Sequence, residues 1–204
     1  MLKNAVTDII NYIWPMMLIV ITIIVSIRLS YIITNRKKIK LYEELINLGF
    51  IIYIMSLFYV VTFQDINYGT SNFVPFKEIT RYSIGSKLFF KNVVGNVLMF
   101  TPLGFFISYY LQSKRLYLPF FLTILLSGVI EFTQSRIGRT FDIDDIILNV
   151  VGGIIGYNLY KFSKFLPEFT RKTWFLNTVC IIIVVVFILY LLDIYGLISG
   201  WWLF

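Results

Sequence analysis

Six stretches of the chain are apolar for long enough to cross a membrane as helices. They cover residues 12–33, 46–63, 93–111, 116–132, 143–162 and 175–192. A transmembrane helix needs about 20 mostly apolar residues, whereas a strand of a membrane barrel alternates apolar and polar positions over about ten. The pattern therefore predicts an all-α, polytopic membrane helix bundle of about six transmembrane helices.

The composition of the chain agrees with this pattern. Hydrophobic residues make up 58% of the 204 residues and charged residues 14%, against roughly 45 to 50% and about 25% in soluble domains. A water-soluble globular domain is therefore excluded. The chain also contains no histidine, which excludes Ser-His-Asp triads and HExxH zinc sites.

The distribution of Lys and Arg predicts how the helices are oriented. The segments 34–45, 112–116 and 161–174 hold ten of these side chains in 31 residues, and the segments on the other side hold seven in 65. Cationic loops stay on the cytoplasmic side, so we expect both termini to lie outside. The net charge of +7 then belongs to loops that face anionic headgroups, and we expect no nucleic-acid partner.

With this orientation, polar side chains that hydropathy does not explain gather at the outer side. The third predicted helix begins with two Asn one turn apart, and the fourth ends with Glu and Gln on one face. An Arg follows in the connection, and the fifth helix begins with Asp residues and an Asn one turn further on. We expect these side chains to converge into one cluster, called the polar cluster: Asn92, Asn96, Glu131, Gln134, Arg139, Asp142, Asp145 and Asn149.

Several of these features also have a purely structural explanation. The acidic run Asp142 to Asp145, which includes Asp144, could be an N-cap with an acid three residues on, placed where the helix dipole favours negative charge. Arg139 could pair with Asp142 or Asp145 and fix the loop. The two Asn of the third helix could be interhelical hydrogen bonds.

Glu131 is the strongest functional candidate among them. An ionisable side chain inside a membrane is costly and is a functional candidate by default. Glu131 and Asp145 therefore need partners, and the nearest cations in the sequence are Arg139 and Arg136.

Small residues and proline inside the helices are predicted to shape the packing. Gly152 and Gly156 have the GxxxG spacing that lets helices approach closely. Pro102 and Gly104 lie in the middle of the third helix and predict a kink. No second acidic motif of the metal-ligand type is present, so we assign no catalytic residue, metal or cofactor.

The order of these residues is specific as a set. It reads Asn72-Phe73-Val74-Pro75-Phe76, Asn92, Asn96, Phe100, Pro102, Gly104, Ser127, Ile130, Glu131, Gln134, Arg139, Asp142, Asp145, Asn149, Gly152 and Gly156. Over roughly residues 72–160 it resembles the VanZ-like family, most specifically in the spacing from Arg139 to Asn149. One departure is Val150, where the family often shows Thr.

The resemblance implies a small, multi-pass protein of the bacterial cell membrane. The family is named for an accessory determinant of resistance to the glycopeptide teicoplanin in Gram-positive bacteria. We expect a single membrane domain over residues 1–204 with a VanZ-like core at 72–160.

Three functions are compatible with these observations. In the first, which we favour, a non-enzymatic protein uses the polar cluster to bind membrane lipid, a lipid-linked envelope precursor or a lipoglycopeptide. In the second, Glu131 and Asp145 act as general acid and base, or with Asp142 hold a hard cation, in a hydrolase or transferase acting on a polyprenyl or phospholipid substrate. The third is a transporter or flippase, against which the lack of a visible inverted repeat argues.

Overall fold

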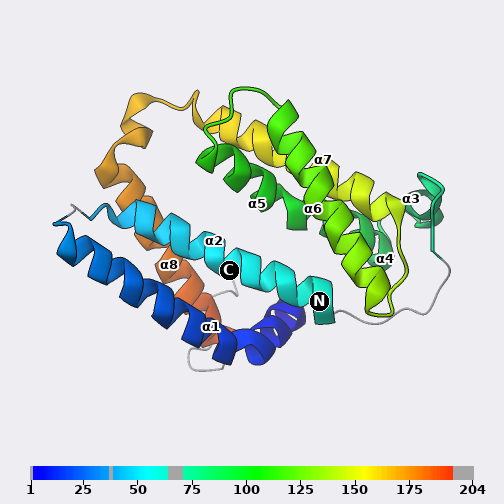
Figure 1. The fold of residues 1–204 in the computed structure, drawn as a ribbon, viewed down its shortest axis with the longest axis horizontal. Coiled ribbons are helices and arrows are strands. Elements are labelled where there is room, and N and C mark those ends of the chain that lie inside the picture. Colours follow the sequence, from blue (N-terminus) through cyan, green and yellow to red (C-terminus); the bar gives the residue numbers. More distant parts are fainter. Residues whose placement is uncertain (1, 37–38, 64–70, 195–204) are drawn as a thin grey trace. The chain divides into compact units, whose positions relative to one another are not determined.

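A computed structural model describes the chain over residues 2–36, 39–63 and 71–194 (Figure 1). Within these ranges the regular structure is helical, apart from one isolated β-bridge. The all-α class predicted from the sequence is therefore confirmed. The backbone forms two compact units, Met1–Val60 with Leu166–Phe204, and Val61–Phe165. The single domain expected over residues 1–204 stays a prediction, and each unit is described by itself.

The first unit contains long helices that are apolar along most of their length. They are α1 (Leu2–Thr34), most of α2 (Leu41–Phe63) and α8 (Thr173–Ile194), the last preceded by the 3-10 helix η2 (Glu168–Arg171). Polar contacts join these helices near one end. Arg28 of α1 and Glu44 of α2 form a bidentate pair, with Nε–Oε2 at 2.9 Å and Nη2–Oε1 at 2.8 Å. The N–H of Tyr42 donates to Oδ1 of Asn177 in α8 at 3.0 Å.

The second unit contains three short helices followed by three long ones. The helices are α3 (Lys77–Arg81), α4 (Lys87–Phe89), the π-helix η1 (Phe90–Val94), α5 (Gly95–Tyr110), α6 (Tyr117–Arg136) and α7 (Ile143–Ser163). Figure 1 shows α3 beside the N-terminal end of α7. Pro102 lies inside α5, where it has no N–H to donate to a preceding carbonyl. The kink expected there stays a prediction.

Glycines let α5 and α7 approach to backbone contact. A Cβ added at Gly152 would collide with the carbonyl of Val97, and one added at Gly156 with the backbone of Thr101. A Cβ at Gly104 would collide in the same way with the backbone of Gly153. Larger residues at these positions would force the two helices apart. This close approach brings polar side chains on the first turns of α5 and α7 within hydrogen-bonding distance.

Five described helices are long and apolar enough to cross a membrane, which agrees with a polytopic membrane bundle. They cover Tyr12–Thr34, Leu41–Thr62, Lys87–Tyr110, Tyr117–Arg136 and Thr173–Asp193. The expected span at 143–162 forms helix α7 but is not in this set. Acidic residues at its start and Asn and Gly along it dilute its apolar character. The outside location of both termini stays a prediction, and residues 1 and 195–204 lie outside the described ranges.

Candidate functional site

The start of α7 is fixed by a short pairing with the segment before α3. Asn72 and Asp142 form a parallel β-bridge, in which the N–H of Asn72 donates to Phe141 O at 2.8 Å and the N–H of Ile143 donates to Asn72 O at 3.0 Å. The side chain of Asn72 also donates to Oδ1 of Asp142 at 2.9 Å. Asn72 is buried. This pairing determines where the chain leaves the loop and enters the helix.

Asp142 caps α7, and its own N–H is bound by a carboxylate from another helix. Oδ1 of Asp142 accepts the N–H of Asp144 at 2.9 Å, as an N-cap residue does. The N–H of Asp142 donates to Oε2 of Glu131 in α6 at 3.1 Å. In a capping box this N–H is bound by the acid three residues on, which here is Asp145. Glu131 takes that role instead, and Asp145 is left for a different contact.

Burial raises the pKa of the Asp142 carboxyl above its ordinary value. The hydrogen bonds from the Asp144 N–H and the Asn72 amide act in the opposite direction, because they stabilise the charged form. Removal from water outweighs them. The proton is therefore held more tightly at this position than on an exposed aspartate.

Asp145 and Asn149 connect α7 to the two neighbouring helices. The amide of Asn96 in α5 donates to Oδ1 of Asp145 at 2.5 Å. One turn further along α7, the amide of Asn149 donates to Oγ of Ser127 in α6 at 2.9 Å. Oδ1 of Asn149 is the buried side-chain acceptor that has no partner within the described part of the chain. The polar cluster thus continues one turn below the acidic residues, between α6 and α7.

Asp144 has a role that the sequence did not indicate. The sequence was compatible with an acid that only favours the start of α7, but the side chain is 1% exposed. Its carboxylate accepts the N–H of Phe76 at 2.5 Å, of Glu78 at 2.7 Å and of Ile79 at 3.2 Å. It therefore holds the segment around α3 against α7. No periodicity in the sequence could show that this acid faces inward.

The expected ion pair between Arg139 and the buried carboxylates is not formed among the described residues. Nη1 of Arg139 donates to the carbonyl of Val61 at 3.2 Å, and the buried Gln134 donates to the same carbonyl at 3.3 Å. Arg136 lies over the ring of Phe132, with Cζ 5.1 Å from its centroid. The expected pair is replaced by hydrogen bonds to backbone groups. The carbonyl of Val61, near the end of α2, accepts from Arg139, and the backbone N–H of Asp142 donates to Glu131.

Asn92 is set apart from the rest of the polar cluster. It lies in η1 and is half-buried, and its side chain makes no hydrogen bond within the described ranges. The sequence placed it one turn from Asn96 on an α-helix. The π-helical turn between them alters that register, because it adds a residue to the turn. Conversely, Asn72 and Ser127 belong to the assembled site, although neither is in the polar cluster.

The arrangement is rich in hydrogen-bond acceptors. Glu131 is 2% exposed, and its carboxylate accepts the backbone N–H of Asp142 at the start of α7. Among the described residues, no group of three or more His, Cys, Asp and Glu is arranged to hold a metal ion. The site can bind donors such as hydroxyl or amine groups through its carboxylates and amides. Arg139 has further guanidinium N–H groups that could bind an anionic oxygen.

Fold and site together define a polytopic α-helical membrane protein with buried carboxylates at one end of a three-helix unit. A family profile described as VanZ/LLP1 matches residues 50–166. The chain belongs to this VanZ-like family. The matched range contains the whole of the second unit and the core expected at residues 72–160.

One curated relative shows how far the similarity extends. Protein VanZ of Enterococcus faecium is 34% identical to the chain over 77 residues, which are 37% of this chain and 47% of the relative. The match thus spans less than half of that relative's length. No solved structure matches the chain.

Proposed function

We propose that this chain is a multi-pass protein of the bacterial cell membrane that binds a lipid or lipid-linked ligand and contributes to tolerance of teicoplanin-type lipoglycopeptides. The ligand's polar head would be bound by the polar cluster, and its acyl tail would stay in the outer leaflet. Membership of the VanZ-like family supports the connection to teicoplanin. The dense Lys and Arg content of the segments 34–45, 112–116 and 161–174 supports an outward-facing cluster.

The observation that carries the proposal is the burial of Glu131 without a direct ion pair among the described residues. Its side chain is 2% exposed and receives one hydrogen bond among the described residues, from the N–H of Asp142. A buried carboxylate needs compensation by hydrogen bonds or charge. One backbone N–H leaves most of its acceptor capacity unused. A ligand that brings amine or hydroxyl donors would supply the missing bonds.

Arg139 adds a complementary group to the same site. Its Nη1 donates to the carbonyl of Val61, and the planar guanidinium has five N–H donors in total. The remaining donors suit a phosphate or carboxylate of the ligand. Envelope precursors and glycopeptides carry both kinds of group, so a site with carboxylates and one Arg fits their heads.

The experiment compares two glycopeptides in a susceptible Gram-positive host that expresses the chain. Teicoplanin carries an acyl tail that anchors it in the outer leaflet, and vancomycin does not. Expression should raise tolerance to teicoplanin more than to vancomycin and leave the peptidoglycan stem peptide unchanged. Glu131→Gln, which keeps an oxygen for the N–H of Asp142, and Arg139→Ala should each abolish the gain at unchanged abundance. Glu43→Gln, on α2 of the other unit, serves as the matched acidic control.

Two results would contradict the proposal. Equal protection against both drugs would show that the tail is not sensed, and an altered stem peptide would indicate enzymatic remodelling of the target.

The sequence suggested Asp144→Ala as an inert control, but the structure argues against it. The carboxylate of Asp144 holds the segment around α3, so its removal would disturb that segment.

A further inference from the structure

The segment that precedes α5 exposes large apolar side chains outside the long helices. Ile84 is 91% exposed and Phe73 70%. Other exposed apolar side chains of residues 71–91, called here the loop segment, are Val74, Phe76, Leu88 and Phe90. So many large exposed apolar side chains along one short segment are uncommon where a protein faces water. The segment is therefore a candidate surface for contact with lipid or another partner.

The polar side of the loop segment is already used for attachment to the second unit. Asn72 is buried in its pairing with Asp142, and Asp144 accepts the N–H groups of Phe76, Glu78 and Ile79. These bonds hold the backbone against the start of α7, as Figure 1 shows for α3. The exposed apolar side chains therefore belong to a segment whose backbone is fixed to this unit.

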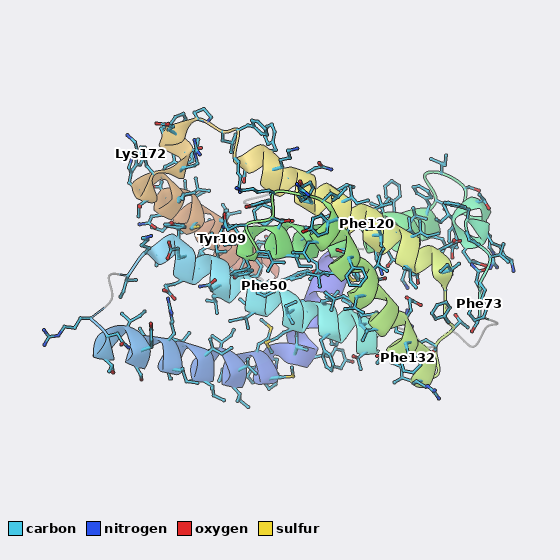
Figure 2. All side chains as sticks on the ribbon, turned by 45° about the horizontal axis from the view of Figure 1, so that its top comes forward. Phe50, Phe73, Tyr109, Phe120, Phe132 and Lys172 are labelled. Carbon is cyan, nitrogen blue, oxygen red and sulfur yellow. The ribbon has the colours of Figure 1, made fainter. Side chains whose placement is uncertain are left out.

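The position of the loop segment in the chain puts it at a membrane boundary. Its last residues, 87–91, begin the candidate span Lys87–Tyr110, and Asp144, to which it is bound, lies at the start of α7. In Figure 2, Phe73 lies at the same end of this unit as Phe132, near the end of the candidate span Tyr117–Arg136. A loop at this depth meets the headgroup region of the bilayer.

The charges of the loop segment favour an anionic lipid surface as its partner. It contains four cationic side chains and one carboxylate: Lys77, Arg81, Lys87, Lys91 and Glu78. Glu78 pairs with Arg81 at 3.2 Å, so the acid is neutralised within the segment itself. Apolar side chains beside Lys and Arg are typical of interfacial membrane segments, which bind anionic lipids.

We propose that the loop segment is an interfacial anchor. It inserts the side chains of Phe73, Phe76 and Ile84 between lipid headgroups, while its lysines bind anionic phospholipid. The anchor holds the start of α7, and with it the polar cluster, at the depth of the headgroups. This proposal does not depend on which ligand the polar cluster binds. It is argued from the exposed side chains of the loop segment and not from the residues of the cluster.

Nitroxide labels in liposomes test the anchor directly. The single cysteine is replaced by Cys180→Ser, and labels are attached to Ile84→Cys or Phe73→Cys in the full-length protein. Lys114→Cys, exposed in the connection between the candidate spans Lys87–Tyr110 and Tyr117–Arg136, is the control. Labels at 84 and 73 should collide more with oxygen, which is soluble in lipid, than with a water-soluble nickel chelate. The label at 114 should show the reverse ratio.

The lipid composition of the vesicles tests the role of the lysines. The label at 84 should lie deeper in vesicles that contain phosphatidylglycerol than in phosphatidylcholine alone. Lys77→Gln combined with Lys87→Gln should remove this difference. Strong nickel collisions at both 84 and 73 would overturn the anchor, since the side chains would then face water. Weak collisions with both reagents would also overturn it and would indicate a protein cover. Equal depth in both kinds of vesicle would overturn the binding of anionic lipid.

Discussion

Oε2 of Glu131 accepts the backbone N–H of Asp142 at 3.1 Å, so a carboxylate of α6 completes the N-terminal cap of α7. An acid on the helix itself could do this in a capping box. Here that acid, Asp145, is bound to Asn96 of α5. Because Glu131 of α6 binds the cap of α7 and Asp145 of α7 binds Asn96 of α5, the three long helices of the unit are joined near the start of α7.

Two substitutions of Glu131 should distinguish its effect on stability from its effect on teicoplanin tolerance. Glu131→Gln keeps an oxygen for the N–H of Asp142 but removes the charge, so abundance should stay near wild type while teicoplanin tolerance is lost. Glu131→Leu removes the acceptor as well, and should lower stability by about 1 to 3 kcal/mol because a buried N–H loses its partner. Immunoblots and growth inhibition measure both quantities. Full tolerance with Glu131→Gln would show that the charge is not needed.

The contact between α5 and α7 should not tolerate a methyl group. Gly104→Ala places a Cβ against the backbone of Gly153, and Gly156→Ala places one against Thr101. Each should lower the free energy of unfolding by about 1 to 3 kcal/mol or more through overpacking. Gly128→Ala on α6 is the matched control, because a Cβ there meets nothing within 4 Å. Thermal unfolding in detergent measures the effect, and equal melting temperatures for all variants would contradict the packing argument.

Asp144 should control the order of the segment around α3. Asp144→Ala leaves the N–H groups of Phe76, Glu78 and Ile79 without their acceptor. Amide hydrogen exchange over residues 71–81 should therefore become faster, while exchange in α5 and α6 changes little. Glu78→Gln, which alters only the surface pair with Arg81, should leave exchange near wild type. Unchanged protection in Asp144→Ala would mean that the segment is held by other contacts.

The stability of the protein should carry a pH dependence that comes from Asp142. Burial raises its pKa in the folded state, so the folded protein binds a proton more readily than the unfolded chain does. The contribution to the free energy of unfolding therefore falls as the pH rises from the ordinary Asp value through the raised one. Asp142→Asn keeps the capping oxygen and should gain stability relative to wild type as the pH rises above the ordinary Asp pKa of about 4. A difference that does not change with pH would contradict this.

The orientation in the membrane can be measured with introduced cysteines in a Cys180→Ser background. Ser71→Cys and Ser135→Cys should react with an impermeant thiol reagent on intact cells, whereas Ser113→Cys should react only after lysis. The reason is the high density of Lys and Arg in residues 112–116 and in the other predicted cytoplasmic segments. Labelling at position 113 alone would reverse the orientation and place the polar cluster inside.

The sequence by itself determined the fold class and the composition of the site. Long apolar runs can be stable in a membrane only as helices whose backbone groups bond internally, so the class follows from hydropathy alone. The spacing of Glu131 and Gln134 on one helix, and of Asp145 and Asn149 on another, predicted single faces because helical geometry repeats every 3.6 residues. These faces turn toward neighbouring helices in the structure.

The tertiary structure alone decided which partner each polar group has. Arg139 binds the carbonyl of Val61, and Glu131 binds the N–H of Asp142, although attraction between opposite charges predicted that the two would pair. Backbone groups of distant segments compete for side chains, and local periodicity contains no information about where those segments lie. For the same reason the sequence predicted that Asp144 only favours the start of α7. Its hydrogen bonds to the N–H groups of Phe76, Glu78 and Ile79 depend on how the loop folds against α7.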